Sequence, residues 1–103
     1  VTVHCIGGHS RGLQCVRVHT KAGWMVLASD AAHYYENVFA RKPFPIVVDL
    51  QNMLDGFETL HGLASKPELI IPGHDPLVRD YFAEAMEPHI HRLDIGPVKA
   101  VVT

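Results

Sequence analysis

The stretch Trp24-Met25-Val26-Leu27-Ala28-Ser29-Asp30 decides the fold of this chain. Five apolar residues and a serine are followed by an aspartate, and the hydrophobic period changes directly after it. A short, almost wholly apolar run of this kind predicts a strand that is covered on both faces of its sheet. Residues 1–6 (VTVHCI) and 13–20 (LQCVRVHT) alternate in part and are rich in β-branched side chains, which predicts two further strands before it.

Downstream of Asp30, the apolar residues follow helical spacing. Residues 31–40 predict a short helix that ends before the prolines of residues 42–45. Asp49 suits the N-cap of a second, longer helix that runs to about Ser65. The core-facing stripe of this helix consists of Leu50, Met53, Leu54, Phe57, Leu60 and Leu63.

The last third of the chain extends the same pattern. Residues 68–71 predict a short buried strand, residues 77–86 an amphipathic helix, and residues 89–102 a terminal strand with a Gly-Pro interruption. The order βββ, helices, β, helix, β predicts a layered α/β or α+β arrangement, with a mixed sheet and helices on one face. A chain of 103 residues holds one domain at most.

The composition excludes several classes of protein. With 48% hydrophobic and 19% charged residues, the chain is expected to fold. Nine Lys and Arg against eleven Asp and Glu give a formal net charge of -2, so we expect no binding to nucleic acid or to an anionic membrane. No apolar run reaches the roughly 20 residues of a membrane span, and no signal peptide is recognisable. Cys5 and Cys15 lack CxxC spacing and are interpreted as buried thiols of a cytoplasmic protein.

Three polar residues lie where predicted strands end. His9 lies in the loop GGHSRG, Asp30 ends the apolar strand, and His74 lies in IIPGHD. Strand ends are where rigid scaffolds present functional side chains, and one carboxylate with two imidazoles is an ordinary donor set for zinc or a similar divalent metal. Each residue alone also has a structural interpretation, since histidine occurs in turns and aspartate caps helices. Spacing alone does not decide between the two interpretations.

Together, these segments carry a resemblance to a known family. Residues 7–14 (GGHSRGLQ), 26–31 (VLASDA) and 71–75 (IPGHD) resemble, in order and spacing, the C-terminal half of a metallo-β-lactamase-fold hydrolase. Within that superfamily they are most similar to the N-acyl-homoserine lactonases, the enzymes of quorum quenching. The resemblance covers about the first 80 residues. It implies that residues 1–103 are the C-terminal portion of a single αββα sandwich domain whose N-terminal half is absent.

The resemblance also implies a site and a reaction. His9 would bind one metal ion, His74 would bind the other, and Asp30 would bridge both. Two divalent ions, zinc or alternatively iron or manganese, would lower the pKa of a shared water and supply hydroxide near neutral pH. That hydroxide would open the ring of a lactone or a related cyclic ester, whose carbonyl a metal polarises.

The chain departs from the family pattern in two ways. The family's His-x-His-x-Asp-His motif is absent, and the nearest string, residues 89–94, comes after the other motifs and is interpreted as exposed strand residues. The chain alone is therefore expected to be inactive, with the N-terminal half or a second subunit completing the site. The tyrosine that lactonases place three residues after the bridging aspartate is His33 here, followed by Tyr34 and Tyr35. The catalytic residues implied are Asp30, His33 and Tyr34, the last two as candidates for binding the substrate carbonyl.

Two further hypotheses stay open. A thioester hydrolase of the glyoxalase type would use the same metal ions. Alternatively, the chain is an inactive structural or interaction fragment, in which His9, Asp30 and His74 are relics and an exposed apolar face is an association surface.

Overall fold

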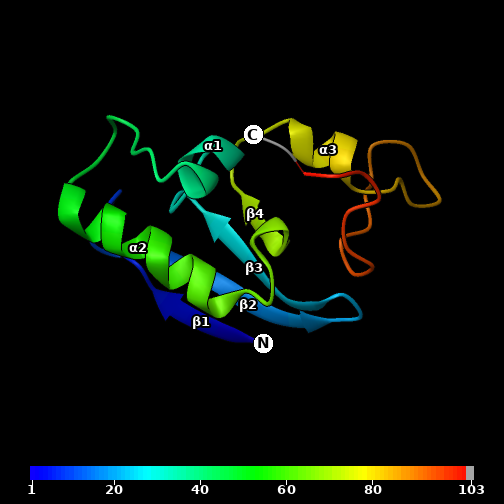
Figure 1. The fold of residues 1–103 in the computed structure, drawn as a ribbon, viewed down its shortest axis with the longest axis horizontal. Helices are drawn as coiled ribbons and strands as arrows, with labels where there is room; N and C mark the ends of the chain where they lie inside the picture. Colours follow the sequence, from blue (N-terminus) through cyan, green and yellow to red (C-terminus); the bar gives the residue numbers. More distant parts are fainter. Residues whose placement is uncertain (102–103) are drawn as a thin grey trace.

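The computed structural model describes residues 1–101, within which lies a four-stranded sheet (Figure 1). Its strands are β1 (Thr2–Cys5), β2 (Gln14–Thr20), β3 (Gly23–Ser29) and β4 (Ile70–Pro72), in the spatial order β1-β2-β3-β4. The pairs β1–β2 and β2–β3 are antiparallel, whereas the pair β3–β4 is parallel. The predicted mixed sheet is therefore confirmed.

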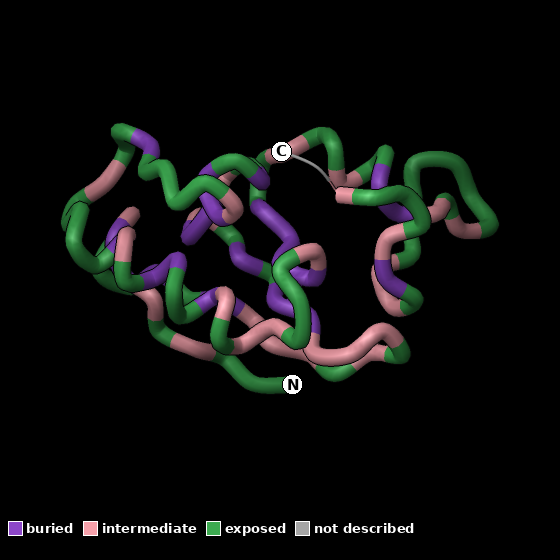
Figure 2. The backbone as a smooth tube through the Cα atoms, in the orientation of Figure 1, coloured by how far each residue is buried: buried purple, intermediate pink, exposed green. Residues whose placement is uncertain are grey.

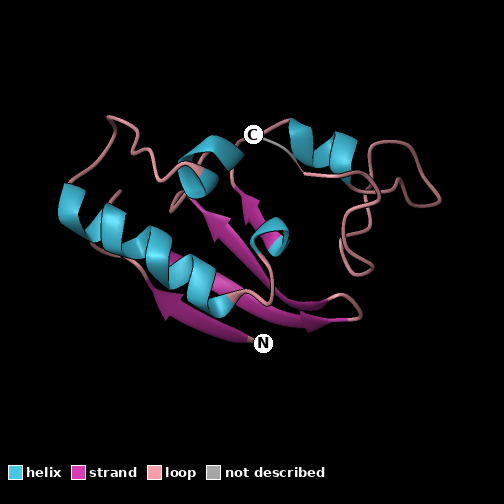
Figure 3. Cartoon of the chain, in the orientation of Figure 1, coloured by secondary structure: helices cyan, strands magenta, loops and turns pink. Residues whose placement is uncertain are grey.

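The helices of the described chain are α1 (Tyr35–Phe39), α2 (Leu50–Leu63) and α3 (Leu77–Tyr81), with a 3-10 helix over Pro67–Leu69. The long helix α2 begins at the predicted N-cap, because the Asp49 carboxylate accepts a hydrogen bond from the Asn52 backbone N–H at 3.0 Å. It extends along the sheet and covers one face of it (Figure 3). The chain thus has the predicted α+β arrangement of a mixed sheet with helices.

The side chains of β3 divide the core between two clusters. Val26 and Ala28 point to the face covered by α2 and are fully buried with Phe57 and Leu60. Met25 points to the opposite face and joins a second buried cluster, which contains Tyr35, Leu69, Ile71, Tyr81 and Phe82. Figure 2 shows the resulting buried band along β3 and β4 in the middle of the molecule. The apolar strand is therefore central because its two faces both supply core.

The helix predicted over residues 31–40 begins only at Tyr35. A turn precedes it, because the Asn37 side chain accepts hydrogen bonds from the backbone N–H groups of His33 and Tyr34, at 3.1 and 2.8 Å. These donors are satisfied by a side chain instead of by another turn of helix. The prediction was right about the position of this helix and wrong about its length.

The helix predicted over residues 77–86 is also shorter, since it ends at Tyr81. Phe82 takes extended backbone there, and its side chain is buried in the second cluster. Met86, by contrast, is fully exposed. Phe82 thus joins the core from extended backbone and not from the predicted helix.

The terminal strand predicted over residues 89–102 is wrong. Residues 89–101 contain no strand, and an isolated bridge joins His91 to Glu84. Gly96 has a φ of +79°, a left-handed conformation that interrupts extended backbone. Val102, the last residue of the prediction, lies outside the described residues.

The two cysteines differ in exposure. Cys15 is fully buried beside α2, and burial raises the pKa of its thiol, which makes it an inert core residue. Cys5 is exposed, because it lies on the edge strand β1, so its interpretation as a buried thiol is wrong. Both cysteines are free thiols.

Across residues 1–101, none of the helices has the length and apolar character needed to cross a membrane.

Candidate metal centre

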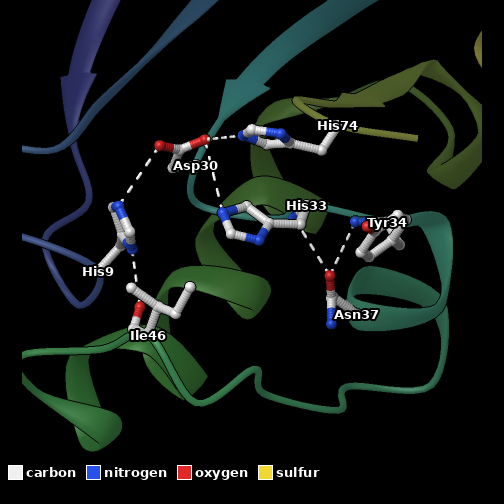
Figure 4. Close-up of polar contacts among 7 residues, drawn as sticks. All are labelled: His9, Asp30, His33, Tyr34, Asn37, Ile46 and His74. Carbon is white, nitrogen blue, oxygen red and sulfur yellow. Dashed lines mark hydrogen bonds and ion pairs between the residues drawn. The ribbon is translucent and has the colours of Figure 1, made fainter. Parts of the chain in front are cut away.

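Four candidate residues meet where β3, the loop after β1 and the loop after β4 come together (Figure 4). The Asp30 carboxylate lies between three imidazoles. Its Oδ2 atom is 3.4 Å from Nε2 of His9, and its Oδ1 atom is 2.8 Å from Nε2 of His74 and 3.6 Å from Nε2 of His33. The structure therefore brings together His9, Asp30 and His74, the predicted metal ligands, with His33 between the two other imidazoles.

His9 is held with one defined nitrogen toward the carboxylate. Its Nδ1–H donates a hydrogen bond to the Ile46 carbonyl at 2.7 Å, and a carbonyl can only accept. Nε2 of the neutral ring therefore carries the lone pair that faces Asp30. A metal-binding histidine commonly has its other ring nitrogen fixed in this way.

The glycine loop before His9 is fastened to the start of α2. The Gly8 carbonyl accepts hydrogen bonds from the N–H groups of Val48 and Asp49, at 2.8 and 3.0 Å. Gly8 has a φ of +85°, and a Cβ atom there would lie 2.8 Å from the backbone of Met53. Glycine is required at this position because the loop and the helix approach so closely.

Asp30 follows a strained end of β3. Ser29 has a φ of +53°, and the pairing of β3 with β4 shifts register between Leu27 and Ser29. A non-glycine residue in this region costs about 1–3 kcal/mol and is found at functional sites. The Asp30 carboxylate follows this irregularity directly and lies 2.8 Å from Nε2 of His74.

Backbone contacts hold the His74 loop against the segment after Asp30. The N–H groups of Gly73 and His74 donate to the carbonyls of Ala32 and His33, both at 2.9 Å. A Cβ atom at Gly73 would lie 2.6 Å from the carbonyl oxygen of Ser29. Only glycine therefore permits the approach that places His74 beside the carboxylate.

Asp75 fastens the same loop to two helices. Its Oδ2 atom accepts the N–H of Tyr35, the first residue of α1, and its Oδ1 atom accepts the N–H of Leu77, the first residue of α3, both at 3.0 Å. Sequence reasoning treated Asp75 only as part of the Gly-His-Asp turn. The contact with Leu77 spans two residues and is local, whereas the contact with Tyr35 spans 40 residues, which no local pattern reports.

His33 is the most confined of the four side chains, with 15% of it exposed. Its ring stacks on Phe44, with ring centroids 3.8 Å apart and planes 12° from parallel. Burial lowers the pKa of His33, and the nearby imidazoles of His74 and His9 lower it further against the opposing effect of Asp30. The neutral ring is thus favoured at neutral pH.

Tyr34 lies at the edge of this cluster. Its side chain is half exposed, and its ring meets the ring of His33 edge-on at 6.4 Å. It lines a cavity of about 660 Å³ together with Tyr35, Glu36, Ala40, Lys42, Asp75, Pro76 and Leu77. Tyr34 is therefore beside the carboxylate cluster and open to a ligand, whereas His33 is inside it.

Asn37 lies beside the candidate site, and the sequence analysis assigned it no role there. It is buried, it accepts the N–H groups of His33 and Tyr34, and its Nδ2 donates to the Lys42 carbonyl at 2.8 Å. It thereby links the His33 backbone to the loop that carries Phe44. A polar residue at an otherwise core-facing helical position was the available signal in the sequence.

Replacing Asn37 with alanine is expected to lower the free energy of unfolding by about 1–3 kcal/mol, because buried N–H and C=O groups lose their partner. Urea unfolding of the full-length protein measures the change. Asn52→Ala is the matched control, since Asn52 is exposed on α2, and it should change stability by less than about 0.5 kcal/mol. Equal effects of the two substitutions would contradict the role of Asn37 as the link between the His33 backbone and the loop that carries Phe44.

The string at residues 89–94 takes no part in this cluster. Nδ1–H of His91 donates to the Phe82 carbonyl at 2.9 Å, and Arg92 pairs with Asp94 at 2.8 Å. In the described chain, the residues whose donor atoms could surround one metal ion are His9, Asp30 and His33, all within 4.8 Å of one another. Histidine nitrogens and a carboxylate oxygen are ligands that zinc, iron and manganese accept.

Comparison with solved structures shows which proteins the chain resembles. The chain matches an N-acyl homoserine lactone hydrolase with the product N-hexanoyl-L-homoserine bound at its catalytic metal center, and an AiiA mutant of B. thuringiensis with N-decanoyl-L-homoserine bound at its active site. Each match has a TM-score of 0.64 and 26% sequence identity, and each covers 76% of this chain and 32% of the other. A quorum-quenching N-acyl homoserine lactone lactonase matches equally, over 75% of this chain.

The chain therefore has a metallo-β-lactamase-like fold, and the predicted resemblance to the N-acyl-homoserine lactonases is confirmed. It spans about a third of the length of the solved lactonases that it matches. No family model matches the sequence. No curated protein matches it either.

Proposed function

We propose that these residues are part of a metal-dependent hydrolase that opens lactones of the N-acyl-homoserine lactone type. The observation that carries this proposal is the Asp30 carboxylate, whose Oδ2 faces His9 and whose Oδ1 faces His74. A carboxylate whose two oxygens face different nitrogen donors suits a bridge between two cations. His9 and His74 are accordingly proposed as ligands of different ions, with Asp30 as a ligand of both.

When bound, two divalent ions, zinc or alternatively iron or manganese, supply hydroxide near neutral pH and polarise a carbonyl. The residues of this chain hold and orient the reactants. Asp30 fixes the positions of both cations, and His33 or Tyr34 binds the lactone carbonyl oxygen. Tyr34 reaches the cavity beside the cluster, which gives room for the rest of the substrate.

The remaining ligands are proposed to come from outside these 103 residues, from an N-terminal half of the same domain or from a second subunit. Two features support this. The chain spans about a third of the solved lactonases. In addition, Val3, Val16 and Leu27 form a row across β1, β2 and β3 on the face away from α2, and Val3 and Leu27 are 57% and 37% exposed. We expect the rest of the fold to cover this apolar row, and we expect these residues alone to be inactive.

We propose a cytoplasmic location for the protein. Cys5 and Cys15 are both free, which suits a reducing cytoplasm. The substrate proposed is a small lactone or ester.

The test uses the full-length protein. Metal analysis should find about two equivalents per chain, and removal of the metal by a chelator should abolish lactone hydrolysis measured by pH-stat, with recovery on adding zinc back. A folded full-length protein that holds no metal would contradict the proposal.

Two alternatives predict different results. A thioester hydrolase of the glyoxalase type would release a free thiol from thioesters and leave lactones intact. A structural fragment would keep its biological activity in the variant Asp30→Ala. Acid released from lactones without any free thiol supports the lactonase proposal over both.

A further inference from the structure

One ring nitrogen of His33 is buried inside the cluster. Its Nε2 atom is fully buried and makes no hydrogen bond with any residue of the described chain. Leaving such an atom without a partner costs about 1–3 kcal/mol. The other two imidazoles lie further out, with 22% of His9 and 54% of His74 exposed. The least exposed imidazole of the cluster is therefore also the one whose inward nitrogen has no partner.

The ring of His33 is fixed in this orientation from several sides. Phe44 stacks on one face of it, and Asn37 accepts its backbone N–H. Its carbonyl accepts the N–H of His74. The stacking on Phe44 holds the plane of the ring, and in this plane Nε2 is the atom that faces Asp30. Figure 4 shows it between His9 and His74, with a nitrogen toward the carboxylate.

The distances around this nitrogen match those between ligands of one ion. In a tetrahedral site with bonds of about 2.0–2.2 Å, two ligand atoms lie about 3.3–3.6 Å apart. Oδ2 of Asp30 lies 3.4 Å from Nε2 of His9, and Oδ1 of the same carboxylate lies 3.6 Å from Nε2 of His33. One ligand atom from each of the three residues lies within 4.8 Å of the other two, which is close enough to surround one ion. His74, at 2.8 Å, has instead the spacing of a hydrogen bond to the carboxylate.

We propose that His33 is a metal ligand, which shares one divalent ion with His9 and Asp30. This inference rests on the proposed metal site and changes the role of His33 within it. The chain then supplies two imidazoles and a carboxylate to the same ion. Tyr34, beside the cavity, is left as the residue that meets the substrate carbonyl.

The test measures metal binding in the full-length protein, independently of hydrolysis. His33→Phe keeps an aromatic ring against Phe44 and removes the nitrogen. We expect its affinity for zinc to fall at least about tenfold, since even partners that only orient a ligand are worth 10–100-fold. The X-ray absorption spectrum of the zinc should show one imidazole fewer, and the visible spectrum of the cobalt-loaded variant should change. His19→Phe is the matched control, because His19 packs on Trp24 outside the cluster, and it should alter neither readout.

Each outcome decides the inference. Unchanged zinc affinity and unchanged imidazole count in a folded His33→Phe protein would overturn it. If that variant does not fold, His33→Tyr, which carries the residue of the lactonases, is measured in the same way. A wild-type protein that binds no metal would overturn both proposals. Zinc binding that depends on His33, in a protein that does not open lactones, would overturn the proposed function alone.

Discussion

Replacing Asp30 with asparagine should reduce lactone hydrolysis by the full-length protein at least about 1,000-fold, the scale of losing one member of a catalytic unit. The amide keeps the shape of the carboxylate, but it has one acceptor oxygen and one NH2 donor. It cannot present an anionic oxygen both to the side of His9 and to the side of His74. The bound metal is therefore expected to fall from about two equivalents to one or none. Metal analysis and pH-stat kinetics measure the two effects.

Asp55→Asn provides the matched control for this substitution. Asp55 is exposed on α2, where its carboxylate accepts a hydrogen bond from the side chain of Gln51. The same chemical change there should leave metal content and activity as in the wild type, with a stability change below about 0.5 kcal/mol. Retention of two metal ions by Asp30→Asn would contradict the bridging role. Loss of metal with activity intact would contradict the metal-dependent mechanism.

The predictable part of this fold rests on short-range patterns. The apolar run at residues 24–29 predicted the central strand, and Asp49 predicted the start of α2 correctly. The terminal strand predicted over residues 89–102 was wrong although the local composition favours it. The residues after His89 are rich in strand-forming types, but the left-handed backbone at His89 and Gly96 breaks the extended conformation. Composition favoured a strand there, and no neighbouring strand edge stabilises one.

The candidate site also has a part that the sequence predicts and a part that it does not. His9, Asp30 and His74 follow strand ends and family motifs, so the sequence was sufficient to propose them, and the structure places them together. The confinement of His33 was not predictable, because it depends on Phe44, which lies eleven positions along the chain in a proline-rich loop. The linking role of Asn37 likewise depends on tertiary contacts. Residue type and local spacing propose ligands, whereas the fixing of their orientation is a property of the packed fold.

Gly73 gives the second large effect, because it determines how closely two backbone segments approach. Its replacement by alanine would place a Cβ atom 2.6 Å from the carbonyl oxygen of Ser29 and 3.4 Å from the carboxylate of Asp30. Because the nearest atom is backbone, the two loops must separate. We expect a loss of about 1–3 kcal/mol in the free energy of unfolding, as for other overpacked sites. A displacement of His74 by as little as about 1 Å from Asp30 should lower kcat/KM about 100-fold.

Gly62→Ala separates this effect from a general response to the substitution. Gly62 lies on α2, and a Cβ atom there would meet nothing within 4 Å. Because alanine is the better helix former, this control should raise stability by up to about 1 kcal/mol and leave kcat/KM unchanged. Urea unfolding and lactone kinetics of both variants measure the difference. If Gly73→Ala kept wild-type stability and activity, the close approach of the two loops would not be what places His74 at the carboxylate. If Gly73→Ala is still folded under the conditions of the assay but its kcat/KM is lower, the close approach serves the position of His74 and not only the packing of the fold.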